Sequence, residues 1–287
     1  MEAHKPDEPA QVVIRRLGEI ARQEQVAILY AAESGSRAWG FASPDSDYDV
    51  RFVYARAPAA YLSLQPRRDV IERHAGPDRL DIGGWDVAKA LTLMLRANAT
   101  LWEWLDSPVV YADDGVFAPA ARRLFEDHAS PRGLGRHYLG LARRQLKLLG
   151  AGESVPLKKY FYVVRPLLAF AAIEAGRCPP PMSVSALLRS APPPADVARA
   201  LDELLARKRR TPELGRGKRI AALDRWIAMR LSACDPGTLP DACRSGTDRA
   251  ERLFVASIGL DPDNMRRLPR GARLDEPGGP AGSAGFS

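Results

Sequence analysis

The chain has 287 residues, of which 46% are hydrophobic and 27% charged, as is typical of a soluble globular protein. The net charge of +7 and a pI near 9.5 favour anionic partners such as nucleotides or nucleic acid. The polar start does not resemble a signal peptide, and no apolar run approaches the ~20 residues of a membrane span. We therefore expect a cytoplasmic protein that contacts no membrane. The cysteines match no zinc-binding spacing and are predicted to be free thiols: Cys178, Cys234 and Cys243.

The first part of the chain predicts an α/β domain over residues 1–97. Apolar residues at helical spacing predict a helix over 12–21, and two β-rich runs predict strands over 26–32 and 48–54. A hairpin around a turn at 75–78 and a helix after Asp86 complete the pattern. This order predicts a short mixed sheet flanked by helices.

The second part predicts an all-α domain over residues 98–262. Pro-rich connectors separate segments of helical spacing at 117–129, 133–150, 156–176, 197–209 and 217–234. The last residues, 263–287, are rich in Gly, Pro and Ser and are predicted to be a disordered tail.

Two aspartates, Asp47 and Asp49, stand one residue apart at the start of a predicted strand. Residues two apart share one face of a strand and lie roughly 6.6–7 Å from each other, so the two carboxylates repel. Metal ions of a catalytic pair lie about 3.5–4 Å apart and prefer oxygen ligands when they are Mg²⁺. A divalent cation bound by both carboxylates is therefore a physical reason for the pattern.

A metal site of this kind needs a third carboxylate, for which the sequence offers two candidates. Asp81 is flanked by Leu80 and Ile82 in a predicted strand, so it faces out of the pleat while they face in. Asp86 stands where a helix N-cap belongs. We take Asp81 as the third ligand and Asp86 first as the cap.

Gly35 and Ser36 follow the first predicted strand. Glycine lets the backbone turn and approach a ligand closely, and the Ser36 hydroxyl and neighbouring N–H groups can hold phosphate oxygens. Arg37 adds a donor for phosphate or for a carboxylate.

These residues resemble the signature of the DNA polymerase β-type nucleotidyltransferase superfamily, which is Gly-Ser, about ten residues, Asp-x-Asp and a third acid on a later strand. Gly35, Ser36, Asp47, Asp49 and Asp81 match that signature. More narrowly, the segments "SGSRAWGF", "SPDSDYDVRFVY", "LDIGGWDVAKAL" and "LKKYFYVVRPLLA" resemble a bacterial RlaP-like family that is associated with RNA repair genes. The resemblance implies a nucleotidyltransferase fold for the α/β domain.

The resemblance also implies an activity. A nucleoside triphosphate (NTP) would be the substrate, and a nucleoside monophosphate would pass to an acceptor hydroxyl while pyrophosphate leaves. Two Mg²⁺ ions, for which Mn²⁺ can substitute, would be held by Asp47 and Asp49, one of them also by Asp81. Ser36 and the adjacent backbone would hold the β- and γ-phosphates.

Several basic residues have two interpretations. Arg51 shares the face of the aspartates, so it either contacts phosphate or acceptor, or orients one aspartate through an ion pair. Lys159 and Arg165 lie on a predicted helix whose basic face can bind a triphosphate or an RNA backbone, or can simply be solvated; Lys158 is seven residues before Arg165 and shares its face. The basic segment 207–219 is either an RNA-facing patch or a solvated connector.

Other residues are assigned to packing or to the surface. Trp39 and Phe41 can stack a base but are predicted to pack beneath their loop, and Trp85, Trp102 and Trp104 are predicted to pack in the core. Glu33 and His74 are predicted to be surface residues.

The favoured function is thus metal-dependent nucleotidyl transfer. The alternative is a catalytically silent nucleotide- or RNA-binding module with a regulatory role. Within the enzyme class the acceptor stays open between an RNA end, a small molecule and a protein hydroxyl. The base of the NTP and the oligomeric state are not indicated by any motif.

Overall fold

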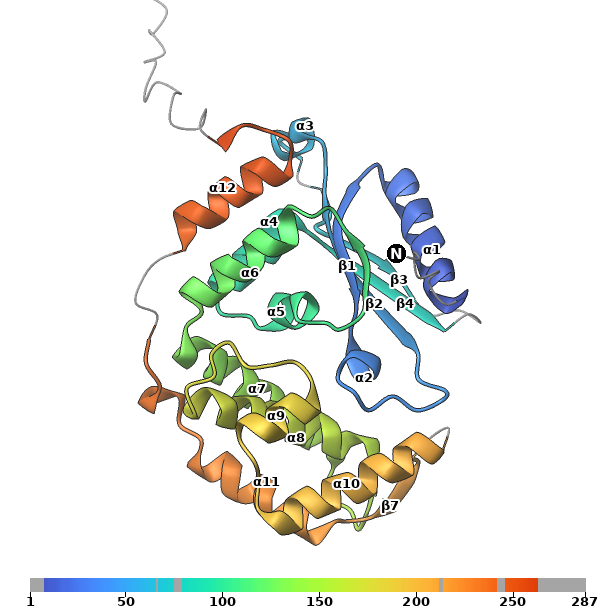
Figure 1. Ribbon diagram of the computed structural model, residues 1–287, viewed down its shortest axis with the longest axis vertical. Coiled ribbons are helices and arrows are strands. Elements are labelled where there is room, and N and C mark those ends of the chain that lie inside the picture. Colours follow the sequence, from blue (N-terminus) through green and yellow to red (C-terminus); the bar gives the residue numbers. More distant parts are fainter. Residues whose placement is uncertain (1–7, 66, 75–78, 212–213, 242–245, 263–287) are drawn as a thin grey trace, which may run out of the picture.

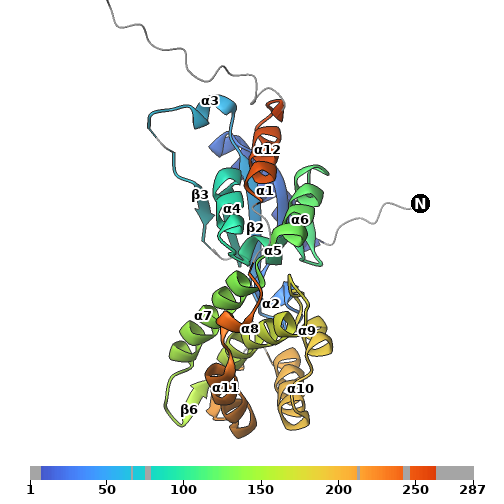
Figure 2. The same ribbon diagram turned by 90° about the vertical axis from the view of Figure 1, so that its left-hand side faces the viewer.

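A computed structural model of the protein describes residues 8–65, 67–74, 79–211, 214–241 and 246–262. The turn expected at 75–78 and the tail expected at 263–287 lie outside these ranges. Figure 1 shows a sheet-containing part above and a helical part below, and Figure 2 shows the same two parts from the side. Within the described ranges, no helix is both long enough and apolar enough to cross a bilayer.

The upper part is built on a mixed, five-stranded sheet, which confirms the predicted sheet type. The strand order is β3-β4-β2-β1-β5. The central strand β2 pairs in parallel with β4, whereas β1 pairs antiparallel with β2 and β5, and β3 antiparallel with β4. The strands are β1 (Ala27–Glu33), β2 (Tyr48–Ala55), β3 (Val70–Arg73), β4 (Leu80–Asp86) and β5 (Val110–Asp113).

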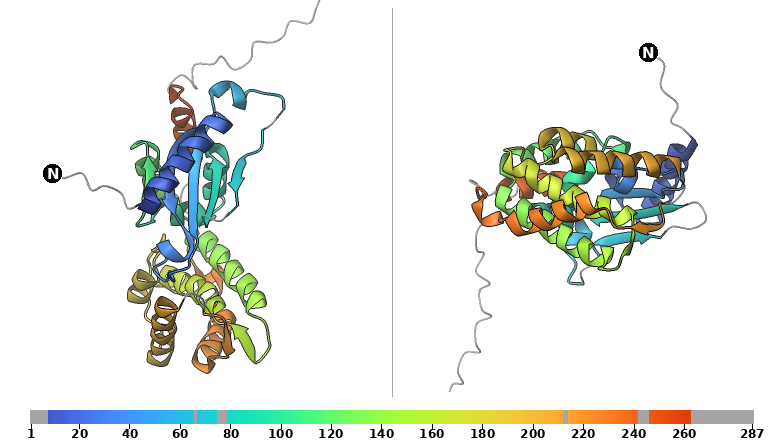
Figure 3. Two further views of the ribbon diagram at one scale, coloured as in Figure 1. Left: turned by 90° about the vertical axis from the view of Figure 1, so that its right-hand side faces the viewer. Right: turned by 90° about the horizontal axis from the view of Figure 1, so that it is seen from below.

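Helices cover both faces of this sheet, because the strands alternate apolar residues toward each face. On one face α1 (Glu8–Glu24) buries Val13, Leu17 and Ile20 against side chains such as Val50 and Phe52. The other face is covered by α4 (Val87–Leu95), α5 (Thr100–Leu105) and α6 (Phe117–His128). The left view of Figure 3 shows α1 and these helices on opposite sides of the strands.

The close pairing of β2 with β4 depends on a glycine. Gly84 pairs with Phe52, and a Cβ at Gly84 would lie 2.2 Å from the Phe52 ring. Gly84 thus lets the Phe52 ring of the neighbouring strand lie across the backbone of β4.

The lower part consists mainly of helices, of which α7 (Pro131–Leu149) and α8 (Lys158–Glu174) form the central antiparallel pair. The remaining elements are α9 (Val184–Ser190), α10 (Ala195–Arg210), α11 (Ala221–Ala233), a 3-10 turn η1 (Pro236–Thr238) and the small sheet of β6 (Ser154–Pro156) and β7 (Arg216–Lys218). The last helix, α12 (Thr247–Ser257), returns to the upper part and packs on α4 and α6.

The expected division of the chain needs correction in two respects. Strand β5 belongs to the sheet although it follows residue 97, because the apolar edge of β1 is completed by a segment far along the chain. The region expected to be all-α also contains the strands β5, β6 and β7. The division into two domains stays a prediction, since one apolar cluster runs through both parts.

The two parts meet at the loop between the short helix α2 (Gly35–Ala38) and β2. Another short helix, α3 (Pro58–Tyr61), lies at the opposite end of the sheet (Figure 1). Phe41 from this loop is 1% exposed and stacks on Phe161 of α8, with ring centroids 4.7 Å apart. Trp39 contacts Tyr162 of α8 edge-on. The prediction that these two aromatic residues pack rather than stack a base is therefore confirmed.

Candidate active site

Gly35 places the backbone directly against Asp49. Its φ is +60°, and a Cβ at this position would lie 1.9 Å from Asp49 Oδ2. The N–H of Ser34 donates to the carbonyl of Asp49 at 2.8 Å, which holds the turn on the start of β2. Only glycine combines this backbone conformation with this approach. The Gly-Ser turn and the aspartates are therefore parts of one site.

The loop between the turn and β2 is held by hydroxyls and by Arg37. Ser46 Oγ accepts from Ser36 Oγ at 3.1 Å and from the N–H of Ser43 at 2.8 Å. The Arg37 guanidinium lies over the Tyr48 ring and donates to two loop carbonyls, those of Ser46 at 2.7 Å and of Asp47 at 3.1 Å. Two donors of the Arg37 fork thus shape the loop, and its contact with phosphate stays a prediction.

Asp47 and Asp49 line one cavity of about 310 Å³, which we call the carboxylate cavity. Its acidic side comes from the loop and the start of β2, and its other side comes from the helical part, with Lys158 and Tyr162 on α8 and Lys208 on α10. Ser36, Ser43 and Ser46 also line it. Carboxylates thus face lysines across a single space.

The carboxylate of Asp49 is under electrostatic stress. Burial raises its pKa, the charges of Asp81 and Asp47 raise it further, and Arg51 acts in the opposite direction. Proton uptake or a bound cation would relieve this stress. The environment of Asp49 is therefore suited to a positive ligand.

Glu33 supports Asp49 from within the protein. Its side chain is 1% exposed, accepts from the N–H of Asp49 at 2.9 Å and accepts from the Tyr111 hydroxyl. Burial raises the pKa of Glu33. The prediction of a surface acid is wrong, because β5 closes over the end of β1 and brings Tyr111 to it. The sequence signal for the burial of Glu33 was its position between an apolar segment and the Gly-Ser turn.

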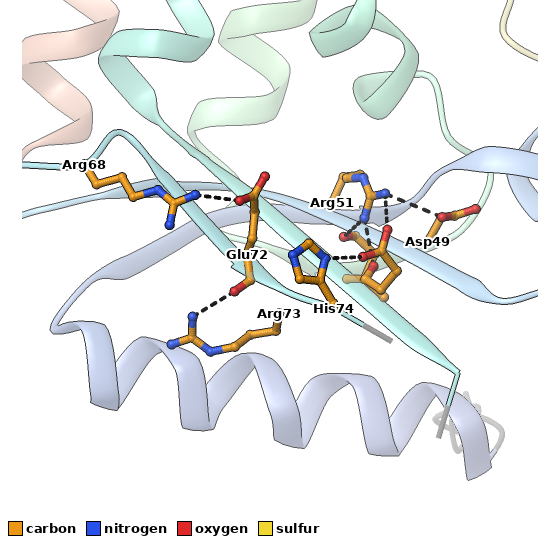
Figure 4. A network of polar contacts seen from close by, with 8 residues as sticks. Asp49, Arg51, Arg68, Glu72, Arg73 and His74 are labelled. Atoms are coloured by element: carbon orange, nitrogen blue, oxygen red, sulfur yellow. Dashed lines mark hydrogen bonds and ion pairs between the residues drawn. The ribbon is translucent and has the colours of Figure 1, made fainter. Parts of the chain in front are cut away.

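Arg51 lies between Asp49 and the third acid, Asp81. The two aspartates are register partners on the parallel strands β2 and β4. Arg51 Nη2 lies 2.6 Å from Asp81 Oδ2 and 3.5 Å from Asp49 Oδ1, and Nη1 donates to the Asp81 carbonyl at 2.8 Å. Figure 4 shows the Arg51 guanidinium pointing to Asp49. Of the two interpretations of Arg51, this geometry favours the ion pair.

The three aspartates suit a divalent metal in chemistry but are incompletely assembled. Carboxylate oxygens are the ligands that Mg²⁺ prefers, and Asp47 and Asp49 both line the carboxylate cavity. Asp81 instead pairs with Arg51. Over the described part of the chain, no three His, Cys, Asp or Glu side chains are grouped as a metal site. Asp47 and Asp49 are therefore placed to hold such an ion, whereas Asp81 is held by Arg51.

Asp86 and His74 lie where the sequence places them. Asp86 caps α4 by accepting from the N–H of Ala88 at 2.9 Å, which confirms the cap. The His74 side chain is 88% exposed, and its Nδ1 lies 4.0 Å from Asp81. The surface prediction for His74 is confirmed.

The two lysines at the start of α8 lie in different places. Lys158 lines the carboxylate cavity, whereas Lys159 lies 3.4 Å from Gln145 Oε1 and over the Tyr162 ring. The sequence favours Lys159 for the nucleotide contact without excluding Lys158. The structure places Lys158 at the cavity instead, because neighbouring residues on a helix point about 100° apart.

Arg165 lies in the core and does not line the carboxylate cavity. It is 2% exposed, its Nη1 lies 2.9 Å from Glu103 Oε1, and its Nε donates to the Met182 carbonyl at 3.1 Å. The guanidinium also stacks over Trp39. The nucleotide-binding prediction for Arg165 is therefore corrected. Lys158 and Arg165 share a helix face, but Lys158 lies at the cavity, whereas Arg165 lies two turns further on and contacts the upper part through Glu103 and Trp39.

Lys208 was predicted only as one member of the basic segment 207–219. It is 7% exposed, lies 4.7 Å from the Phe41 ring centroid and lines the carboxylate cavity. Burial lowers its pKa to about 8, helped by the charge of Lys158. The sequence signal is its spacing: it follows Leu204 by four residues and Leu201 by seven, so it shares the apolar face of α10.

Comparison with known proteins agrees with this geometry. YcgL, an uncharacterized protein of Bacillus subtilis (strain 168), is 42% identical over 221 residues, which cover 77% of this chain and 85% of that protein. The family described as "RlaP: RNA repair pathway DNA polymerase beta family" matches residues 10–256, a stretch that contains the sheet, the carboxylate cavity and α8. The resemblance inferred from the Gly-Ser and Asp-x-Asp motifs is confirmed. The chain belongs to the RlaP family of the DNA polymerase β type.

Proposed function

We propose that the protein is a metal-dependent nucleotidyltransferase that moves a nucleoside monophosphate from an NTP to an acceptor hydroxyl. One observation carries the proposal: Asp47 and Asp49 face Lys158 and Lys208 across one cavity. A metal–triphosphate complex needs both signs of charge, since carboxylates bind the metal and ammonium groups bind the phosphates.

The protein's own groups have distinct tasks in this proposal. Asp47 and Asp49 hold Mg²⁺ or Mn²⁺, and such ions supply charge neutralisation at the triphosphate and activation of the acceptor hydroxyl. Lys158 and Lys208 orient the β- and γ-phosphates, so that the α-phosphorus faces the acceptor. The Ser36 hydroxyl and the backbone after Gly35 line the same space and complete the phosphate contacts.

An RNA 3′ hydroxyl is the acceptor that we favour. The family is described as belonging to an RNA repair pathway, and the chain carries a net charge of +7. Small-molecule and protein hydroxyls are the competing acceptors, and all three use the same chemistry at phosphorus.

Label transfer tests the proposal. The protein is incubated with each α-labelled NTP, with Mg²⁺ or Mn²⁺, and with an RNA bearing a free 3′ hydroxyl. We expect labelled RNA with the unmodified chain and at least a ~100-fold loss in Asp47→Asn with Asp49→Asn, because a catalytic metal site is removed. The matched control is Asp202→Asn, an exposed acid on α10. Absence of label on RNA, small molecules and the protein itself with every NTP would contradict the proposal.

The second candidate is a catalytically silent nucleotide- or RNA-binding module. The ion pair of Arg51 with Asp81, which keeps the third acid from a metal, favours it. In that case the Asp47→Asn, Asp49→Asn protein would bind RNA as well as the unmodified chain does, and neither would transfer label.

A further inference from the structure

A second cavity lies at the end of β2 and β4 opposite to the carboxylates. We call it the basic cavity and define it by Arg56, Tyr61, Arg67, Arg68, Lys89 and Arg96; its volume is about 530 Å³. Arg56 follows Asp49 by seven residues of extended chain at about 3.3 Å each, which separates the two by roughly 23 Å. The basic cavity is therefore distinct from the carboxylate cavity, and its size is that of a small-molecule site.

Three segments bring the positive charges together. Arg56 follows β2, Arg67 and Arg68 precede β3, Lys89 lies on α4, and Arg96 is the C-cap of α4. Lys89 and Arg96 are seven apart, with Thr92 and Leu93 of the lining between them, so the helix and its cap turn one face to the cavity.

The two acids of the lining are already matched by neighbours. Asp69 pairs with Lys89 at 2.9 Å. Asp86 is 5% exposed, accepts from the N–H of Ala88 at 2.9 Å and accepts from the Tyr61 hydroxyl at 3.0 Å. Hydrogen bonds from neutral donors leave the charge of Asp86 in place, and the lining holds five cationic side chains against these two carboxylates.

The arginines, in contrast, have donors to spare. No described residue gives the Arg67 or Arg96 side chain a hydrogen bond or an ion pair. The buried Nε of Arg56 also lacks a hydrogen-bond partner among the described residues. Within the part of the chain that the structure describes, the Arg68 side chain pairs with Glu72 at 2.6 Å on the surface, a contact of low energy. Arg67, Arg68 and Arg96 are exposed, so water can hydrate them, whereas the buried Nε of Arg56 needs an acceptor. An anion in this concave site would supply that acceptor and would pair with the exposed arginines.

We propose that the basic cavity binds a small ligand bearing an oligophosphate group, at a site separate from the carboxylate cavity. Guanidinium groups bind phosphate oxygens two at a time, and several arginines from three segments match a chain of phosphates better than a single carboxylate. The discrete cavity favours a small ligand over the extended groove that an RNA backbone follows. This inference goes beyond the proposed transfer reaction and does not depend on it.

Binding of inorganic tripolyphosphate tests the proposal. The full chain is titrated calorimetrically in chelator, so that no metal supports binding at the carboxylates. We expect Arg67→Glu with Arg96→Glu to weaken binding at least about tenfold, because two charged contacts become repulsive. Arg15→Glu with Arg22→Glu, the same two charge reversals at exposed positions on α1, serves as the matched control and leaves binding unchanged.

Two further measurements keep the result decisive. Hydrogen exchange on the unmodified chain is expected to show protection by tripolyphosphate in α4 and in residues 60–69, and not in residues 34–49, whether or not the variant folds. Lys158→Glu changes the lining of the carboxylate cavity alone, so tripolyphosphate binding at the basic cavity stays intact. The proposal is overturned if Lys158→Glu, rather than the arginine variant, abolishes binding. It is also overturned if a ten-nucleotide RNA binds through Arg67 and Arg96 while tripolyphosphate and nucleoside triphosphates do not.

Discussion

The two ends of the parallel strand pair β2–β4 carry opposite chemistry. At the start of the strands, Asp49 and Asp81 stand in register and share the cation of Arg51. At their end, five cationic side chains, among them Arg56 and Arg96, line a space together with two acids. The start of the two strands therefore carries negative charge that a ligand can neutralise, and their end carries positive charge that a ligand can neutralise. The same sheet thus presents acidic groups at one end and basic groups at the other, about seven residues apart.

The two cavities also differ in which parts of the protein line them. The carboxylate cavity is completed by Lys158 and Lys208 from the helical part, so its geometry depends on the packing of Phe41 on Phe161. The basic cavity is built from the sheet part alone. We therefore expect perturbations of the interface to affect the first and to spare the second.

The largest expected effect comes from Gly35→Ala. A Cβ at Gly35 would lie 1.9 Å from Asp49 Oδ2, so either the turn or the carboxylate must move, and label transfer should fall at least about 100-fold. The matched control is Gly40→Ala, which also has a positive φ, +87°, but has nothing within 4 Å of the added Cβ. Equal losses in both variants would mean that backbone strain, and not the contact with Asp49, sets the activity. Tripolyphosphate binding at the basic cavity should survive both changes.

A second prediction concerns Arg51, whose guanidinium pairs with Asp49 and Asp81. Arg51→Ala removes the competitor for Asp49 and Asp81, so Mn²⁺ should bind about tenfold more tightly, a difference of about 1.4 kcal/mol. Calorimetric titration of Mn²⁺ without nucleotide measures it. Arg73→Ala, which breaks a surface ion pair with Glu24 at 2.6 Å, is the control and should leave Mn²⁺ affinity unchanged. Weaker Mn²⁺ binding in Arg51→Ala would show that the arginine organises the carboxylates rather than competing for them.

A third prediction uses the buried lysine. Because burial lowers the pKa of Lys208 to about 8, its charge is present at pH 7 and is lost as the pH rises through 8. NTP affinity should therefore decline between pH 7 and 9, and Lys208→Met should remove most of that decline while weakening binding at pH 7 about fivefold. Lys147→Met, an exposed lysine on α7, is the control. An identical pH profile in Lys208→Met would exclude a phosphate contact by this residue.

The smallest expected effect comes from a substitution of Asp86, which lines the basic cavity. Asp86→Asn keeps an N-cap for α4, since asparagine caps as well as aspartate, but removes a negative charge. Tripolyphosphate should bind about threefold more tightly, the gain expected of a charge whose effect is reduced by its two hydrogen bonds. Label transfer should not change. A loss of transfer would show that the basic cavity influences the reaction at the carboxylate cavity.

The sheet and the acids could be predicted from sequence because each has a local signal. The alternation around Asp47 and Asp49 gives the strand and its outward face, and the apolar flanks of Asp81 give the second strand. Asp86 was recognisable as a cap from the helical pattern that follows it. These inferences need only the periodicities of strands and helices.

What could not be predicted depends on contacts between distant segments. Glu33 is buried because β5, about 80 residues later, covers it with Tyr111. Arg165 belongs to the core because Glu103, 62 residues earlier, lies beside it. The choice of Lys158 over Lys159 depends on where α8 begins relative to the cavity, and no local pattern sets that rotation.

The central claim is that the carboxylate cavity receives the metal and the triphosphate. The most direct test is a crystal structure with Mn²⁺ and a non-hydrolysable NTP, with the metal located by its anomalous scattering. The account predicts an Mn²⁺ peak bound by Asp47 and Asp49, with phosphates next to Lys158 and Lys208. Nucleotide found only in the basic cavity, or no Mn²⁺ at these two aspartates, would contradict it.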